Sequence, residues 1–143
     1  MLDMVEDVLA FHRKFACYVG DYPHLPERSI VDLRLRLIRE EYCELIEAIH
    51  RVDLAAIADA ITDLMYVIIG TAITLGIDIR PIWQAVQRAN MAKTGGGTRA
   101  DGKILKPPGW KAPDVSALIE LQIHAASQTE GSIWLLCGHK SIA

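Results

Sequence analysis

Several glutamates stand close together in a segment that otherwise has the spacing of an amphipathic helix. They are Glu40, Glu41, Glu44 and Glu47, within EEYCELIE. At about 100° per residue, Glu41 and Glu44 fall on the axis of an apolar stripe that should face the core. That stripe consists of Ile30, Leu33, Leu37 and Ala48. Carboxylates therefore occupy positions where leucine would be expected.

Clustered carboxylates of this kind could bind a metal ion. Unpaired buried carboxylates are costly and repel one another, so a cation between them would stabilise the folded chain. Side chains three residues apart on a helix are neighbours, which lets Glu41 and Glu44 hold one small ion. Oxygen ligands suit Mg²⁺ or Mn²⁺. The alternative is a solvated face on which these glutamates pair with Arg36, Arg39 or Arg51.

A second acidic pair follows in a very apolar stretch. Asp59 and Asp63 are the only charged residues between positions 54 and 77. They share a stripe with Tyr66, Gly70 and Thr74, opposite a wide apolar face. That predicted core face consists of Leu54, Ile57, Ile61, Met65, Ile68 and Leu75. Two antiparallel helices joined by a short turn could bring both acidic pairs together around one or more divalent ions. The alternative is a mildly polar face that touches a loop or another subunit.

The elements that position these acids are helices. The periodicity predicts helices over residues 2–17, 29–51, 54–76, 78 to about 90–92, and 115–126. We expect each of the last three helices to be capped by an aspartate, namely Asp53, Asp78 and Asp114. Ser29 and Asp32 resemble a capping box at the start of the second helix. Gly76 is expected to end the third helix. No alternating strand pattern is found. The sequence therefore predicts an all-α bundle of four or five helices.

A long segment after the fourth helix differs in composition. Residues 92–113 hold five of the ten glycines and only one acid, Asp101. Its bases are Lys93, Arg99, Lys103, Lys106 and Lys111. A connection of this length is usually functional or mobile, so we expect either a cationic cover or a solvated linker. The domain is expected to span residues 1–127, and residues 128–143 show no clear period.

The composition limits the function classes. A chain of 143 residues is one domain by length, and its net charge of -3 argues against a nucleic-acid polymer as partner. The longest uncharged stretch, 64–77, is too short to cross a membrane. The N-terminus carries acids where an export signal would carry bases. Three dispersed cysteines (Cys17, Cys43 and Cys137) indicate reduced thiols, so we expect a cytoplasmic protein.

Three motifs together resemble a known family. EEYCE, DAITDLMYVIIGTAITLGID and QRANMAK…ADGKILKPPGW resemble the all-α nucleoside triphosphate pyrophosphohydrolases. This superfamily includes MazG-like proteins, dimeric dUTPases and phosphoribosyl-ATP pyrophosphohydrolase; the small single-domain members are most similar, over about residues 11–115. The resemblance implies a homodimeric or homotetrameric bundle. It also implies Mg²⁺- or Mn²⁺-dependent cleavage of a nucleoside triphosphate into monophosphate and pyrophosphate, in house-cleaning or nucleotide-pool control.

The resemblance also implies roles for the acids. Glu41, Glu44 and Asp63 would be metal ligands, and Glu40 a further ligand or the base that prepares the attacking water. Glu40 and Glu41 are thus the expected catalytic residues. The family commonly has Glu-x-x-Asp on its second acidic helix, where this chain has Ala60 in the first position. Asp59, one residue earlier, could substitute with a shorter reach, which leaves the number of metal ions open.

Substrate contacts follow from the same resemblance. Asn90 and Lys93 would contact sugar or phosphate, and Lys103 and Lys106 would fold over the phosphates. His12 is a weaker candidate, expected to be a partly exposed polar residue. The other aromatic candidates for the nucleobase are Phe11, Phe15, Tyr18 and Trp83, of which we expect Phe11 and Phe15 to be core. Trp110 is expected to anchor the basic segment onto the bundle.

Two other functions remain as alternatives. A di-iron oxidoreductase needs two Glu-x-x-His motifs, and the chain has only the one from Glu47 to His50; Glu120 and His124 have the wrong spacing. A non-catalytic helical interaction module with a vestigial acidic metal site is the stronger alternative, because of Ala60.

Overall fold

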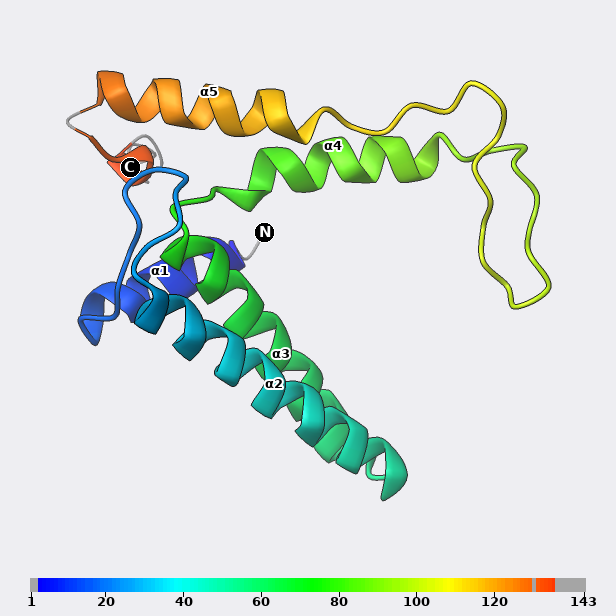
Figure 1. Cartoon of the computed structure of the whole chain (residues 1–143). Helices are drawn as coiled ribbons and strands as arrows, with labels where there is room; N and C mark the ends of the chain where they lie inside the picture. The colour runs from blue at the N-terminus through cyan, green and yellow to red at the C-terminus, as the bar shows by residue number, and fades with distance from the viewer. Residues whose placement is uncertain (1–2, 130, 136–143) are drawn as a thin grey trace, which may run out of the picture.

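Five α-helices and a short 3₁₀-helix form the described part of the chain, in a computed structural model that describes residues 3–129 and 131–135 (Figure 1). They are α1 (Met4–Lys14), α2 (Arg28–His50), α3 (Leu54–Thr74), α4 (Ile79–Met91), α5 (Val115–Gln128) and η1 (Ile133–Leu135). Over these residues there is no β-strand, and strand-like pairing is limited to one isolated bridge between Thr98 and Ile104. The all-α class is therefore confirmed.

Aspartates cap most of the helices through local hydrogen bonds. Asp53, Asp78 and Asp114 each accept a backbone N–H of the helix that follows, as predicted. The capping box at Ser29 is wrong: α2 begins at Arg28, and Glu27 at its N-cap makes no side-chain cap hydrogen bond. Helix α1 is shorter than expected, because Asp3 caps it and it ends at Lys14.

The core lies where α1 crosses the C-terminal half of α3. Val8 and Leu9 of α1 pack there with Ile73 of α3. Ile133 and Trp134 of η1 complete this core, although the sequence pattern left their segment unassigned. The Trp134 indole donates a hydrogen bond of 2.7 Å to the carbonyl of Gly20. The last described residues therefore fold back onto the loop that follows α1.

Helices α2 and α3 form a long antiparallel hairpin (Figure 1). The predicted core face of α3 is wrong in this chain, since Ile61, Met65 and Ile68 are 42–48% exposed. The buried residues of α3 are Ala60, Ile69, Gly70, Ile73 and Thr74. Small residues on α3 let α1 lie close to it. At Gly70, an added Cβ would lie 2.9 Å from Nε2 of His12, which is too close for an ordinary contact. By length and composition alone α3 could cross a membrane, but here it packs between α1 and α2.

Helices α4 and α5 form an arm that leaves this three-helix part (Figure 1). Gln122 of α5 joins the start of α4 by accepting from the N–H and donating to the carbonyl of Asp78, at 2.9 Å each. Arg80 pairs at 2.9 Å with Asp3 and with Glu6 of α1. No residue of α4 is buried. The arm is therefore fixed at its base, and the side chains of α4 remain at least partly exposed.

Candidate functional site

The α2–α3 hairpin brings the two predicted acidic pairs together. We call this group the acidic cluster: Glu40, Glu41, Glu44, Asp59 and Asp63. Glu41 is the only partly buried member, the other four being exposed. Burial raises the pKa of Glu41, and the negative charges of Glu44, Asp63, Glu40 and Asp59 raise it further. The antiparallel packing expected from the sequence therefore produces one concentrated patch of negative charge.

Basic residues of the same chain do not neutralise this cluster. In the described part of the chain, no ion pair or side-chain hydrogen bond reaches any of its five carboxylates. Arg51 pairs instead with Glu47, at 3.9 Å, at the exposed end of α2. Of the Glu–Arg pairs that the solvated-face alternative predicts, the described residues form the one between Glu47 and Arg51, and Glu47 lies outside the acidic cluster. The charge of the cluster remains available for a cation.

The donor set fits a hard divalent cation, because all five side chains offer carboxylate oxygens. Within residues 3–129 and 131–135, however, no three potential ligands converge closely enough to hold a metal ion as they stand. The burial expected from the apolar stripe is also incomplete in a single chain, since Glu44 is exposed and Glu41 is only partly buried. Metal binding would require the exposed carboxylates to adjust their rotamers around Glu41.

An exposed aromatic group lies beside the acidic cluster. The Phe11 ring centroid is 4.6 Å from that of Phe15 and 5.5 Å from that of Tyr66. Tyr66 follows Asp63 by three residues, hence by less than one helical turn. The expectation that Phe11 and Phe15 are core is wrong, because they are 41% and 57% exposed. These flat rings could therefore receive a planar group placed next to the carboxylates.

Two basic residues, the buried His12 and the partly buried Arg34, lie beneath this surface. His12 is buried rather than partly exposed, and its Nδ1 lies 3.1 Å from the carbonyl of Tyr18. Burial lowers the pKa of His12, and the charge of Arg34 lowers it further. Arg34 donates from Nη2 to the carbonyl of Val67 at 2.7 Å. Sequence reasoning missed Arg34, although it precedes Glu41 by seven residues and so shares its helix face.

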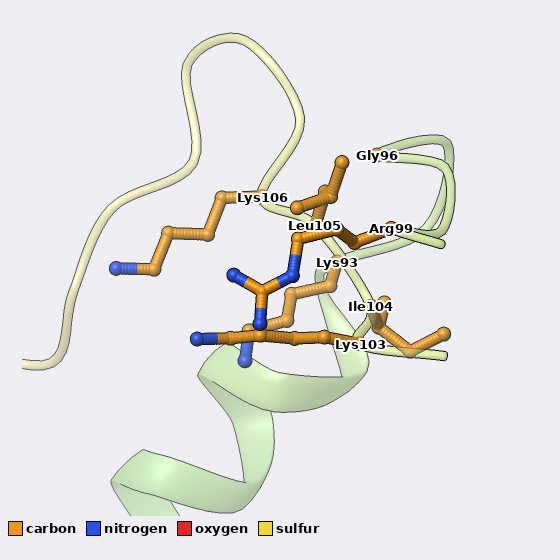
Figure 2. A pocket seen from close by; sticks show the side chains of 7 residues that line it. All are labelled: Lys93, Gly96, Arg99, Lys103, Ile104, Leu105 and Lys106. Atoms are coloured by element: carbon orange, nitrogen blue, oxygen red, sulfur yellow. The ribbon is translucent and has the colours of Figure 1, made fainter. Parts of the chain in front are cut away.

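The basic segment forms a small turn at the far end of the arm. We call residues 93–106 the basic hairpin. Its backbone is held by hydrogen bonds from Arg99 to Lys103 (2.8 Å) and from Leu105 to Gly97 (3.0 Å). A hollow of about 430 Å³ lies within it. Its lining consists of Lys93, Gly96, Arg99, Lys103, Ile104, Leu105 and Lys106, with Lys93, Arg99 and Lys103 pointing to the same side (Figure 2). This cationic hollow has a size and charge suited to phosphate groups.

Trp110 fixes the basic hairpin to α4. Its indole donates a 2.6 Å hydrogen bond to the carbonyl of Ala89, and its ring lies 4.3 Å from the Lys106 ammonium and 5.8 Å from that of Lys93. The expected anchoring role is therefore seen, with α4 as the anchor. Asn90, on the last turn of α4, is exposed nearby.

The predicted substrate-binding residues thus lie apart from the predicted metal ligands. Asn90, Lys93, Lys103 and Lys106 all belong to the far end of the arm, whereas the acidic cluster lies on α2 and α3 (Figure 1). Within one chain the structure therefore builds two half-sites, one acidic and one basic.

Comparison with known proteins identifies the family of the chain through the part that contains the acidic half-site. A search of curated proteins finds no match. The family model described as phosphoribosyl-ATP pyrophosphohydrolase matches residues 8–90, from the middle of α1 to the last turn of α4, which includes the whole acidic cluster. Enzymes of this family are pyrophosphohydrolases that act on nucleotides, typically with a divalent metal ion. The chain belongs to the phosphoribosyl-ATP pyrophosphohydrolase family, a MazG-like group of all-α enzymes.

Proposed function

We propose that this protein is a Mg²⁺- or Mn²⁺-dependent nucleoside triphosphate pyrophosphohydrolase that controls the composition of a nucleotide pool. It would consume one water and cleave the anhydride between the α- and β-phosphates, giving a monophosphate and pyrophosphate. The observation that carries the proposal is the acidic cluster, which lies inside the family match and lacks a basic partner in the described chain.

The carboxylates divide into ligands and a base. We assign the metal to Glu41, Glu44 and Asp63, with Asp59 in place of the acid absent at Ala60. When bound, the ion supplies positive charge to the phosphates and lowers the pKa of a water. Glu41, partly buried between the helices, fixes the position of the ligand set. Glu40 is exposed at the rim of the cluster, where it can accept the proton of the attacking water.

The nucleotide extends from the acidic cluster onto the aromatic group. Phe11, Phe15 and Tyr66 would stack with the base, while Asn90 and Lys93 contact sugar or phosphate and Lys103 and Lys106 neutralise the polyphosphate. His12 is buried against Gly70, so it would not contact the substrate directly. It would act only by supporting the aromatic surface. We further propose a homodimer or homotetramer in the cytoplasm, with neither nucleic acid nor membrane as a partner.

A substrate panel tests this proposal. Purified protein is incubated with canonical and damaged ribo- and deoxyribonucleoside triphosphates and with phosphoribosyl-ATP, with Mg²⁺ or Mn²⁺. Pyrophosphate is detected separately from orthophosphate. We expect pyrophosphate in a metal-dependent reaction; orthophosphate alone would contradict the cleavage position.

Glu44→Ala distinguishes the enzyme from an interaction module. We expect Mn²⁺ to raise the melting temperature of the wild-type protein and Glu44→Ala to abolish both that shift and the activity. Glu120→Ala, at an exposed position of α5, is the control and should retain both. A non-catalytic module would release no pyrophosphate and would show no metal-dependent stabilisation in either protein.

A further inference from the structure

We infer that Arg34 contacts the nucleobase of the substrate and selects 6-oxopurines, the class that includes guanine and hypoxanthine. This inference rests on the proposed function and deepens it, because it names the kind of base that the aromatic group would hold. Neither the acidic cluster nor the basic hairpin gives this arginine a role.

Arg34 is a partly buried cation without a carboxylate partner in the described chain. None of the ion pairs among the described residues includes it. Burial lowers its pKa, and the interaction that raises this pKa again is with the thiol of Cys17. Arginine nevertheless stays charged in proteins, so its desolvation opposes folding. A ligand that accepts hydrogen bonds from the guanidinium would offset part of that cost.

One end of the Arg34 guanidinium is available to a ligand. Its Nε donates to Thr71 Oγ1 at 3.2 Å, and its Nη2 donates to the carbonyl of Val67 at 2.7 Å. Nη1 has no hydrogen bond within the described chain, where no side-chain nitrogen is both buried and unpartnered, so Nη1 reaches solvent. An N–H of Nη1 and the second N–H of Nη2 therefore remain as a fork of two donors.

Gly70 fixes the position of this guanidinium. A Cβ at position 70 would lie 2.7 Å from Nη2 and 3.4 Å from Cζ of Arg34. The first of these distances is too short for a side-chain carbon. The missing side chain thus lets the guanidinium lie directly against the backbone of α3, where Val67 and Thr71 hold it in one orientation.

Arg34 and the acidic cluster lie along the same stretch of the α2–α3 hairpin. Across the hairpin, Arg34 lies against Gly70, and Glu41 interacts electrostatically with Asp63. Seven residues separate these two levels on each helix, which is two turns or about 10 Å. Tyr66 of the aromatic group stands between Asp63 and Gly70 on α3. Carboxylates, ring and guanidinium thus follow one another in the order of the phosphate, the base and the far edge of the base in a nucleotide.

The aromatic group alone would not choose a base. Stacking tolerates every base, because each has a flat face, so selectivity must come from hydrogen bonds to the base edge. The thiol of Cys17 interacts electrostatically with both Arg34 and Tyr66, which puts the guanidinium and the ring close to one common group. The rings would hold the faces of the base, and Arg34 would meet its edge.

The remaining fork of Arg34 matches the acceptor edge of a 6-oxopurine. Guanine and hypoxanthine present two acceptors, O6 and N7, to which arginine donates two parallel hydrogen bonds. Adenine has an amino group at position 6 and would point a donor at the donors of Arg34. Pyrimidines lack an acceptor that corresponds to N7. Because arginine can only donate, Arg34 would favour the 6-oxopurine over the other bases.

Matched purine nucleotides test the inference. Inosine triphosphate (ITP) has an oxygen at position 6 where ATP has an amino group, and GTP serves as a second 6-oxopurine. The kcat/KM of the wild type is measured for each by pyrophosphate release with Mg²⁺. We expect ITP and GTP to exceed ATP roughly 5- to 150-fold. Equal values for the three, or a preference for ATP, would overturn the inference while still supporting a pyrophosphohydrolase.

Arg34→Gln assigns the preference to this side chain. The ratio of kcat/KM for ITP over ATP should fall to about one, mainly through a higher KM for ITP. Arg34→Lys keeps the charge but not the fork and should lose the preference as well, so the test does not depend on one variant folding. Arg36→Gln, at an exposed position of α2, is the matched control and should keep the wild-type ratio. A purely structural role for Arg34 would lower both substrates alike and leave their ratio unchanged, which would contradict the inference.

Cysteine labelling tests the inference without catalysis. Cys17 and Cys43 are both exposed, and Cys17 interacts with Arg34. Inosine monophosphate should slow the reaction of Cys17 with N-ethylmaleimide more than AMP does at the same concentration, with Cys43 as the internal control. Mass spectrometry of the labelled peptides gives both rates. Equal protection by the two nucleotides, or none by either, would overturn the inference. Selective protection in a protein that releases no pyrophosphate would contradict the proposed function alone.

Discussion

The side-chain amide of Gln122 on α5 binds both the N–H and the carbonyl of Asp78, at 2.9 Å each. Asp78 is also the N-cap of α4 and accepts from the N–H and the guanidinium of Arg80. One residue thus fixes both the start and the direction of the arm that carries the basic hairpin.

Gln122→Leu should therefore destabilise the protein by about 1–3 kcal/mol, because two backbone groups lose their partner. Urea unfolding followed by circular dichroism measures this loss. Gln128→Leu, which removes only an exposed contact with His124, is the control and should change stability by less than about 0.5 kcal/mol. Equal unfolding midpoints for the two variants would contradict the role of Gln122.

Neutralising Glu41 should stabilise the metal-free protein. Burial and four neighbouring carboxylates raise the pKa of Glu41, so its ionised form is disfavoured by folding at neutral pH. We expect Glu41→Gln to raise the melting temperature in EDTA by about 2–4 °C and to remove the stabilisation by Mn²⁺. Glu47→Gln, at an exposed position paired with Arg51, should do neither.

His12 should make stability depend on pH. Burial lowers its pKa in the folded chain below the ordinary value of 6.5, so the unfolded chain binds the proton more readily. Stability is complete above pH 6.5 and is lost as the pH falls below it, by at most about 1.4 kcal/mol per pH unit. In urea unfolding at several pH values, the free energy of unfolding should depend less steeply on pH for His12→Asn than for the wild type. Parallel curves for wild type and His12→Asn would contradict this assignment.

The aromatic group should contribute to nucleotide affinity without affecting the metal. Loss of one stacked ring by Phe15→Ala should raise the KM about tenfold, while stabilisation by Mn²⁺ stays as in the wild type. Phe15→Trp keeps a planar surface and should restore the KM. Simultaneous loss of metal stabilisation in Phe15→Ala would show that the ring supports the fold instead.

Residues 131–135 should be required for stability. A chain that ends after Thr129 lacks the buried side chains of Ile133 and Trp134 and should lose roughly 3–5 kcal/mol. A chain that ends after position 135 keeps them and serves as the control. Thermal unfolding of both, beside the full chain, gives the comparison; matching midpoints for the two shortened chains would refute the contribution of η1.

Local chemistry explains what the sequence predicted well. Asp53, Asp78 and Asp114 cap their helices through hydrogen bonds to residues two or three positions away, so short patterns reveal them. The meeting of Glu41 with Asp63 was likewise predictable, since helical spacing and one short turn determine it. Such features do not depend on the rest of the fold.

Contacts between residues far apart in the chain determine the features that the sequence did not predict. Helix α3 is apolar on more than one face, and the face that is buried depends on where α1 crosses it, at Gly70 and Thr74. The direction of α4 depends on a contact between residues 44 positions apart, Asp78 and Gln122. The separation of the two half-sites follows from that direction, which no local pattern encodes.

The bond between the Trp134 indole and the Gly20 carbonyl joins residues 114 positions apart. At about 5–20 residues per second, a ribosome needs roughly 6–23 s to make the chain between them. During that time Val8 and Leu9 have emerged, but part of their cover has not yet been translated. The N-terminal helix therefore completes its packing only late in synthesis, and until then part of its apolar face stays open to chaperones.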